Sequence, residues 1–402
     1  MSGQAARDPR LDFFRGLGMF IILIAHIPWN SWTDWIPARF GFSDGADLFV
    51  FCSGLASSLA FAPIFERRGW FVGVARILHR MWQVYWAHIG GFLVVLAIVA
   101  AADAHFGGGR YSQELMLGDF FTRFQVYAPG LMTLRFVPNY FDILPMYIAI
   151  LGMIPIAMAL ASISRGLVAI AVIASWFATN AGFLTVQADP LSGRDWFFDP
   201  FGWQLVFFTG FAFGKGWLSP PPPDRRLIIA AVALIVLAAP VSCQNGFGCY
   251  AGFGYFPTLG ALHDWLGPVI DKTHIGMLRY VHFLATAYLA YLAAGPRGAN
   301  LRGPIAAAVG RVGQQTLAVF LTGLVGGHVL GIALDVLGRN AMTTAFVNLI
   351  GAASLIVAAA VVAWVKSAPW KGGRPNASLA PREARQPNGM SSAEGQLVGS
   401  NA

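Results

Sequence analysis

Long runs of apolar residues, separated by short polar connections, extend over most of the chain. A helix needs about 20 apolar residues to cross a bilayer, or slightly fewer where neighbouring helices bury it. Ten runs meet this standard, although the sixth is short and rich in glycine. They lie near 13–32, 45–63, 83–102, 141–161, 166–184, 202–217, 226–241, 278–295, 308–332 and 342–365. The pattern predicts an all-α, polytopic integral membrane protein with about ten transmembrane helices.

The composition agrees with a chain embedded in lipid. Hydrophobic residues make up 56% of it and charged residues 11%, whereas soluble domains carry about 25% charged residues. The net charge of +8 could suggest a nucleic-acid partner. Most lysines and arginines, however, fall on one side of the predicted spans, which indicates membrane orientation instead. We therefore expect the lipid bilayer as a partner and no nucleic acid.

The same charge asymmetry predicts the topology. With the N-terminus inside, the inner connections hold most of the basic residues, and an even number of spans places both termini in the cytoplasm. Residues 1–366 are expected to form one membrane domain. Residues 367–402 have no core-forming pattern and are expected to be a disordered cytoplasmic tail.

The first apolar run contains two ionisable residues, Arg15 and His26. Eleven residues of helix advance about 1100°, so both side chains point the same way, about 16 Å apart along the axis. Pro28 leaves the carbonyl of Ile24 without its helical donor and predicts a break, with a cavity beside the histidine. An intramembrane histidine is a candidate functional group, and a neutral imidazole suits a general base. The alternative is a histidine satisfied by a neighbouring helix.

Two aspartates open the second run. Asp44 and Asp47 lie three residues apart, hence on one face of the helix, in a spacing typical of an N-terminal cap. Capping is the preferred interpretation for Asp44. Asp47 could also reach one turn deeper and orient His26, as a carboxylate orients a catalytic imidazole in other enzymes.

Basic and polar residues gather at the cytoplasmic entrance of the third run. Arg76 and Arg80 lie one helical turn apart, on the same side of the membrane as Arg15. Three guanidinium groups could bind a phosphorylated ligand, although the positive-inside rule also explains them. Tyr85 and His88 lie one turn apart inside the span, where polar groups need a reason.

Polar residues also cluster at the outer ends of several spans, which indicates an open cleft there. The outer connections are rich in aromatic residues and carboxylates, which suits sugar rings or an interfacial aromatic belt. A helix-starting role explains Asp142 or Asp271 individually. The other candidates in the cleft are Asn139, Trp203, Gln204, Lys272, His274, Arg279 and His282.

Cysteine usage gives little further information. Cys52 lies in an apolar run and is expected to pack in the core. Cys243 and Cys249 flank a glycine-rich turn and could pair in an oxidising compartment, or stay free. No cluster has metal-ligand spacing, so we expect no metal.

At these residues the sequence resembles the acyltransferase-3 superfamily of membrane acyltransferases. Arg15 and His26 match its signature of an arginine and a histidine on the first span. The segments RLDFFRG, FGFSD, DILPMY, PFGWQ and DKTHIGMLR, with the Tyr85–His88 pair, are similar to the OpgC branch, the succinyltransferases of osmoregulated periplasmic glucans. The likeness runs from Arg10 to about Val365.

The resemblance implies a ten-helix enzyme of the bacterial inner membrane. It would take a succinyl group from cytoplasmic succinyl-CoA, or another acyl-CoA, and deliver it to hydroxyls of a periplasmic glucan, with no permanently bound cofactor. His26 would be the catalytic residue, with Asp47 and Asp44 beside it. The donor would be bound by Arg15, Arg76, Arg80, Tyr85 and His88, although the spacing of Arg76 and Arg80 departs from the arginine pair of the superfamily. The acceptor would be bound by Asp142, Trp203, Gln204, Lys272, His274, Arg279 and His282.

Several alternatives stay open at this point. His26 could deprotonate the sugar hydroxyl for direct attack on the thioester, which we favour slightly, or first accept the acyl group itself. The donor could carry an acetyl group for another envelope polysaccharide. The counter-ion for a succinyl carboxylate could be Arg39, Lys272 or Arg279. A transporter or flippase with His26 in a proton relay is the non-enzymatic alternative.

Overall fold

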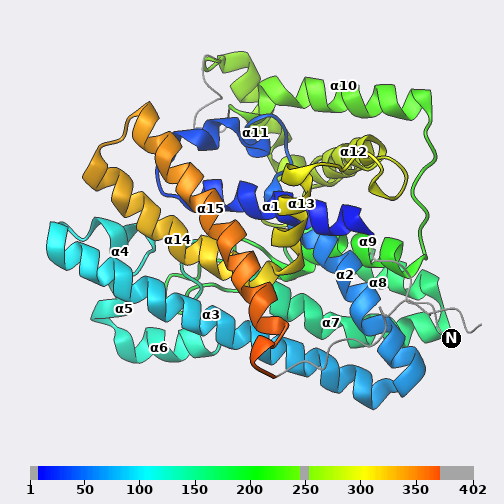
Figure 1. Cartoon of the computed structure of the whole chain (residues 1–402). Coiled ribbons are helices and arrows are strands. Elements are labelled where there is room, and N and C mark those ends of the chain that lie inside the picture. The colour runs from blue at the N-terminus through cyan, green and yellow to red at the C-terminus, as the bar shows by residue number, and fades with distance from the viewer. Residues whose placement is uncertain (1–7, 245–252, 372–402) are drawn as a thin grey trace, which may run out of the picture. The chain divides into compact units, whose positions relative to one another are not determined.

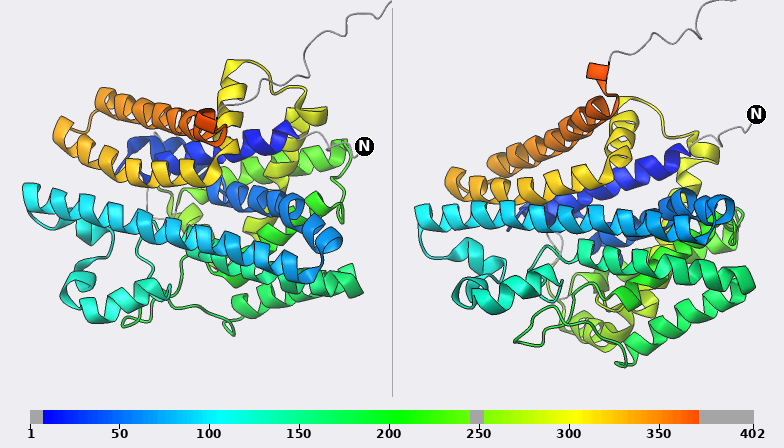
Figure 2. Two further views of the ribbon diagram at one scale, coloured as in Figure 1. Left: turned by 60° about the horizontal axis from the view of Figure 1, so that its bottom comes forward. Right: turned by 90° about the horizontal axis from the view of Figure 1, so that it is seen from below.

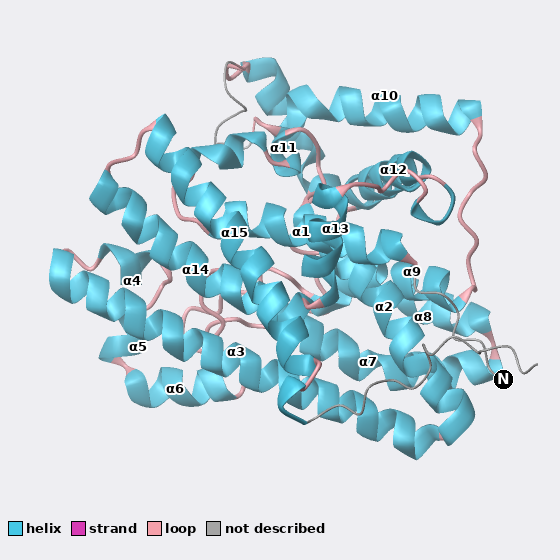
Figure 3. Cartoon of the chain, in the orientation of Figure 1, coloured by secondary structure: helices cyan, strands magenta, loops and turns pink. Residues whose placement is uncertain are grey.

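The computed structural model describes residues 8–244 and 253–371 of the 402-residue chain. These residues form helices and connecting loops, with no β-strand among them (Figure 3). The α-helices are α1 Pro9–His26, α2 Gly45–Arg68, α3 Trp70–Phe106, α4 Arg110–Glu114, α5 Gly118–Thr122, α6 Phe124–Met132, α7 Ile143–Ile163, α8 Arg165–Asn180, α9 Pro200–Lys215, α10 Arg225–Ser242, α11 Pro257–Ile270, α12 Met277–Ala294, α13 Pro304–Gln314, α14 Thr316–Leu337 and α15 Ala341–Lys366. Short 3-10 helices are η1 Ser31–Trp35, η2 Pro37–Arg39, η3 Pro296–Gly298 and η4 Pro369–Lys371. The predicted all-α class is confirmed, whereas most of the predicted disordered tail lies outside the described residues.

Every predicted apolar run coincides with helical structure, with changes at three of the boundaries. The third helix begins at Trp70 rather than near 83. The first helix ends at His26 rather than near 32, because Pro28 cannot continue the helical hydrogen bonds. The run at 308–332 is divided between α13 and α14 at Gln315, whose backbone leaves the helical conformation. The sequence at this break, RVGQQT, is polar, and this interruption of the apolar run is the local sign of it.

Within residues 8–244 and 253–371, six helices are long and apolar enough to cross a membrane: α2, α3, α7, α10, α14 and α15. The chain is therefore a membrane protein, but the predicted number of about ten spans is not confirmed. The helices α8 and α9 have 16 residues each, which is short for a span. Charged residues interrupt the apolar run of α1, which has 18 residues.

The first helix occupies a central position in the unit formed by Met1–Ala363. It contacts α2, α13 and α14, while α3 runs beside α7 and α14 (Figure 1). The long helices run roughly along one another, and α4, α5 and α6 gather near the C-terminal end of α3 (Figure 2). Residues at the C-terminal end of α1 thus lie among elements from distant parts of the sequence.

Glycines allow two helix pairs to approach closely. Between α2 and α9, a Cβ on Gly54 would lie 1.9 Å from the carbonyl oxygen of Phe207. Between α1 and α13, a Cβ on Gly16 would lie 1.9 Å from the carbonyl oxygen of Val309. Small residues at such crossings let backbones pack directly, as in other membrane helix pairs. The α1–α13 contact holds the N-terminal half of α1 in place.

Candidate functional site

His26 is the last helical residue of α1, at the break that Pro28 imposes. Its Nδ1 lies 2.7 Å from the carbonyl oxygen of Ile22. Because a carbonyl can only accept, this contact makes Nδ1 the donor and leaves the lone pair on Nε2. The carbonyl of Ile24, which loses its helical donor, instead accepts from the side-chain amide of Asn30 at 3.2 Å. When the imidazole is neutral, Nε2 is therefore the potential base at this break.

The sequence predicts a cavity beside this break, and the structure has two neighbouring chambers there. The inner chamber, of about 240 Å³, is lined by His26, Asp142 and the apolar side chains of Ile21 and Ile22. The outer chamber is larger, about 940 Å³. The two share wall residues, which are Ala25, Ile36, Ala38, Asp44, Asn139, Tyr140, Phe197 and Lys272. A small chamber with His26 in its wall thus adjoins a larger one.

The outer chamber combines charged, polar and aromatic side chains. Carboxylates, cations and aromatic rings all line it, which provides both hydrogen bonds and flat faces for a polyhydroxyl ligand. Trp29 extends into solvent at its edge, with 71% of its surface exposed. The charged and aromatic lining residues are Trp29, Asp34, Arg39, Phe42, Asp44, Glu114, Tyr140, Phe197, His263, Asp271, Lys272 and Arg279.

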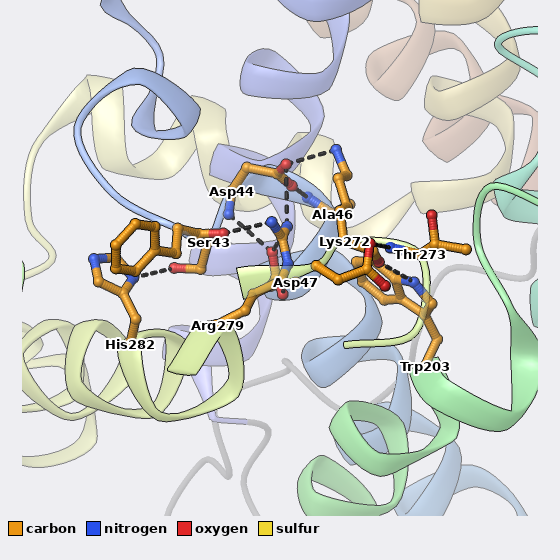
Figure 4. Close-up of polar contacts among 11 residues, drawn as sticks. Ser43, Asp44, Ala46, Asp47, Trp203, Lys272, Thr273, Arg279 and His282 are labelled. Atoms are coloured by element: carbon orange, nitrogen blue, oxygen red, sulfur yellow. Dashed lines mark hydrogen bonds and ion pairs between the residues drawn. The ribbon is translucent and has the colours of Figure 1, made fainter. Parts of the chain in front are cut away.

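A four-membered charge cluster joins α2 to the start of α12 (Figure 4). Lys272 Nζ lies 2.6 Å from Asp44 Oδ2. Arg279 Nη2 lies 2.5 Å from Asp47 Oδ2 and 3.2 Å from Asp44 Oδ2. Burial by itself raises the pKa of Asp44, but the charges of Lys272 and Arg279 hold it well below its usual range. The cluster fixes Lys272 in the wall shared by the two chambers.

The structure does not bring Asp47 to His26. Asp47 is fully buried, and its oxygens accept from Arg279 and from the backbone N–H of Asp44, at 2.8 Å for the latter. Asp44 and Asp47 instead form a capping box at the start of α2, so the predicted cap is confirmed. The ring orientation of His26 comes from Ile22, within its own helix. The spacing of Asp44 and Asp47 gives no indication that Asp47 pairs with Arg279, which lies 232 positions away.

Asp142 lies in the inner chamber and is buried, with 5% of its surface exposed. It precedes α7, but its side chain makes no capping hydrogen bond. Its Oδ1 has no hydrogen-bond partner among the described residues. Burial raises its pKa to about 7, against the lowering effect of the positive charges of Arg194 and Lys272. Simple helix capping, the alternative from sequence, is not what this side chain does.

The other residues predicted to bind the acyl acceptor form hydrogen bonds outside the chambers. Trp203 donates to the carbonyl of Lys272 at 3.0 Å, and Gln204 donates to the carbonyl of Val172 at 2.8 Å. His274 Nδ1 lies 2.8 Å from Asp271, and His282 Nδ1 lies 2.8 Å from Ser43. None of these four side chains lines either chamber, whereas Asp142, Lys272 and Arg279 do.

The residues predicted to bind the acyl donor do not line the two chambers. Arg15 is half-buried on α1, and Arg76 is exposed. Arg80 donates to Gln83 at 3.3 Å, and Tyr85 donates to the carbonyl of Met132 at 2.8 Å. His88 is fully buried, and neither ring nitrogen has a partner among the described residues. None of the five lines either chamber.

The sequence analysis did not identify Tyr140 as a residue of this site, or Glu114 as its hydrogen-bond acceptor. Tyr140 donates to Glu114 Oε1 at 3.0 Å, and its ring lies 5.6 Å from the ring of His26. Trp29 also donates to Glu114, at 3.3 Å. Burial and the charge of Glu114 raise the pKa of Tyr140 above its ordinary value. The position of Tyr140 between Asn139 and Asp142 was the available signal, whereas nothing local distinguishes Glu114.

The cysteines divide as their sequence positions suggest. Cys52 is buried and free, which confirms its expected place in the core. Cys243 is buried and disulfide-bonded. Cys249 lies outside the described residues.

Comparison with protein families gives one assignment. The family described as OpgC protein matches residues 7–367, which is most of the chain. No curated protein and no solved structure matches it. The match confirms the OpgC resemblance read from the motifs and points to an acyltransferase that modifies glucans with succinyl groups in general. The chain belongs to the OpgC protein family.

Proposed function

We propose that the protein is a membrane O-succinyltransferase, which moves a succinyl group from cytoplasmic succinyl-CoA to hydroxyls of a periplasmic glucan. The observation that carries the proposal is the position of His26. Its Nδ1 is held by Ile22, and its ring lines a small chamber that adjoins a large polar one. A histidine held in one tautomer between two spaces suits transfer between two substrates.

The proposed reaction is direct transfer. Nε2 of His26 takes the proton from the sugar hydroxyl while the hydroxyl oxygen attacks the thioester carbonyl carbon. The carbon–sulfur bond then breaks, and the thiolate of coenzyme A takes the proton back from the imidazolium. An ester forms on the sugar, and His26 returns to its neutral state. Lys272, in the wall of both chambers, supplies positive charge near the developing oxyanion.

The acceptor would enter through the outer chamber. Its volume of about 940 Å³ and its mixed aromatic and charged walls suit several sugar units. Asp142, Lys272 and Arg279 are the predicted acceptor residues that line these spaces. Trp203, His274 and His282 would act indirectly, by holding the loop and helix that carry Lys272 and Arg279. Gln204 would act at a further remove, by holding α9 to the carbonyl of Val172 in α8.

The donor would approach from the opposite side of the membrane. Coenzyme A carries several phosphates, and Arg15, Arg76 and Arg80 are the cations that we assign to them. Tyr85 and His88 would line the path of the acyl chain. Asp44 and Asp47 would keep Lys272 and Arg279 in place at the far end of this path.

This scheme requires a defined orientation in the bacterial inner membrane. We propose ten spans with both termini cytoplasmic, in which α1, α8, α9 and α12 cross the bilayer together with the six longer helices. Short or polar helices can be accommodated inside a bundle when neighbouring helices cover them. The close glycine contacts of α1 with α13 and of α9 with α2 support such covering.

The test is a transfer assay with the purified full-length protein in lipid nanodiscs. The protein is incubated with succinyl-CoA and a periplasmic glucan, and succinyl esters on the glucan are measured by mass spectrometry. We expect esters that depend on both substrates. Transfer from acetyl-CoA alone would identify an acetyltransferase instead, and an absence of transfer with either donor would refute the proposal.

A further inference from the structure

Asp142 is a buried carboxyl group in the wall of the inner chamber. Only 5% of its surface is exposed, and one of its two oxygens, Oδ1, has no hydrogen-bond partner among the described residues. Buried polar groups are nearly always paired, because an unpaired one carries a desolvation cost of about 1–3 kcal/mol. An unpaired group in a cavity wall therefore points to a ligand as the missing partner.

The remaining polar side chains of the inner chamber are already engaged within the protein. Each has at least one short contact to another residue, which limits what it can offer to a substrate. His26 contacts Ile22, Asn139 and Tyr140 donate to Glu114, and Lys272 donates to Asp44. Asp142 thus differs from its neighbours.

The surroundings of Asp142 favour the neutral carboxyl. Burial disfavours an ionised carboxylate here, although backbone hydrogen bonds from Asp142 itself and from Phe197 favour it. The charged groups around it are Arg194, whose guanidinium is fixed on the carbonyl of Val137 at 2.6 Å, and Lys272, whose charge is shared with Asp44. Neither offsets burial, which raises the pKa of Asp142 to about 7. Near neutral pH, Asp142 is therefore protonated in a large fraction of the protein molecules.

We propose that Asp142 acts in its protonated form, as a hydrogen-bond donor to the thioester carbonyl oxygen during acyl transfer. This inference rests on the proposed succinyltransferase function and assigns one donor within it. The O–H bond of Asp142 is not broken. The proton that moves is the one that His26 exchanges with the two substrates.

The chemistry of the step gives the reason for a neutral donor. Attack of the sugar oxygen places negative charge on the carbonyl oxygen, and a fixed donor beside it lowers the barrier. A neutral carboxyl can donate to that oxygen, whereas a carboxylate would repel it. Buried acids kept neutral for this purpose are known in other enzymes. Lys272 supplies the positive charge, and Asp142 supplies a neutral donor in the wall of the same chamber.

The proposal has a definite sign in pH. Asp142 is active when protonated, so its contribution is complete at low pH and is lost as pH rises through its raised pKa. His26 acts as a base and has the opposite dependence. The ionisable groups that line the inner chamber with Asp142 are His26, Asp44, Tyr140 and Lys272, and the charge of Arg194 also acts on it.

Two substitutions separate a neutral donor from an ionised base. Asp142→Asn keeps a donor of similar shape but cannot ionise, and we expect it to retain transfer to within about 10-fold, with no loss on the alkaline side. Asp142→Leu removes the donor and is expected to lose about 100-fold or more in kcat. Asp199→Asn is the matched control, since Asp199 is also a buried aspartate before a helix but binds Phe201 and Gly202 N–H groups. We expect the control to keep both activity and pH profile.

Infrared difference spectroscopy tests the protonation state without an assay of transfer. The spectrum of wild-type protein minus that of Asp142→Asn should contain the carbonyl band of a neutral carboxylic acid near neutral pH. Absence of this band overturns the proposal. So does an Asp142→Asn variant that is as inactive as Asp142→Leu, or an Asp142→Leu variant as active as wild type. If wild-type protein transfers no acyl group at all, the proposed function fails, and the infrared band still decides whether Asp142 is protonated.

Discussion

Arg279 on α12 and Asp47 on α2 form a buried ion pair that ties the two helices together beside the chambers. Nη2 lies 2.5 Å from Oδ2, and Nε lies 3.2 Å from Oδ1. Asp47 is closed to solvent, and the Arg279 side chain is 6% exposed. Arg279 also donates to the carbonyl of Phe42. The pair therefore positions the segment between η2 and α2, which carries wall residues of both chambers.

Breaking this pair should be costly. We expect Arg279→Met to reduce the free energy of unfolding by about 3–5 kcal/mol, because it leaves the charge of Asp47 buried without its partner. Reversible unfolding in bicelles measures the change. Lys215→Met provides the control, since its ion pair with Glu66 is partly exposed and exposed pairs contribute at most about 1 kcal/mol. Equal effects of the two substitutions would show that the buried pair contributes no more to the free energy of unfolding than the partly exposed one.

Local patterns predict the features of this protein that depend on neighbouring residues. Apolar runs predict the helices, because a helix satisfies its own backbone in lipid. Pro28 predicts the end of α1 and the chamber beside His26, and the spacing of Asp44 and Asp47 predicts the capping box. Each of these is decided within a few residues of the chain.

Features that depend on distant residues are not visible in the sequence. Asp47 and Arg279 are 232 positions apart. The sequence therefore does not show that Asp47 pairs with Arg279, and it allowed the expectation that Asp47 orients His26. Glu114 receives hydrogen bonds from Trp29 and Tyr140, which belong to two other segments.

The crossing of α2 and α9 gives a second prediction. A Cβ at Gly54 would lie 1.9 Å from the carbonyl oxygen of Phe207, and this backbone atom cannot move aside. We expect Gly54→Ala to cost about 3 kcal/mol, the upper part of the usual range for overpacking. The measurement is again unfolding in bicelles.

Gly90 is the matched control for this substitution. A Cβ there meets nothing within 4 Å, so Gly90→Ala in α3 should be neutral or stabilise by up to about 1 kcal/mol through helix propensity. A Gly54→Ala variant as stable as Gly90→Ala would mean that α2 and α9 do not cross as described.

His26 gives a third prediction, in which structure and chemistry can be separated. We expect His26→Asn to lose about 10²–10⁴-fold in transfer, because the amide cannot act as the base. Its N–H groups can still donate to the carbonyl of Ile22, so stability should change little. His26→Ala should lose the same activity and some stability as well. A His26→Asn variant that keeps its activity would reduce His26 to a packed polar group.

Arg39 gives the last prediction, on the choice between succinyl and acetyl donors. Among the three cations considered for the succinyl carboxylate, Lys272 is bound to Asp44 and Arg279 to Asp47. Arg39 lines the outer chamber, and its buried Nε has no hydrogen-bond partner among the described residues. It therefore has donors available for a carboxylate.

Under the proposed function, Arg39→Gln should lower kcat/KM for succinyl-CoA by about 10- to 100-fold, the value of one charge-assisted hydrogen bond. Transfer from acetyl-CoA, which has no terminal carboxylate, should be unchanged and serves as the internal control. A parallel fall with both donors would assign Arg39 to the support of the chamber wall. An unchanged preference for succinyl-CoA would return the choice to Lys272, because the guanidinium of Arg279 is already filled by Asp47, Asp44 and Phe42.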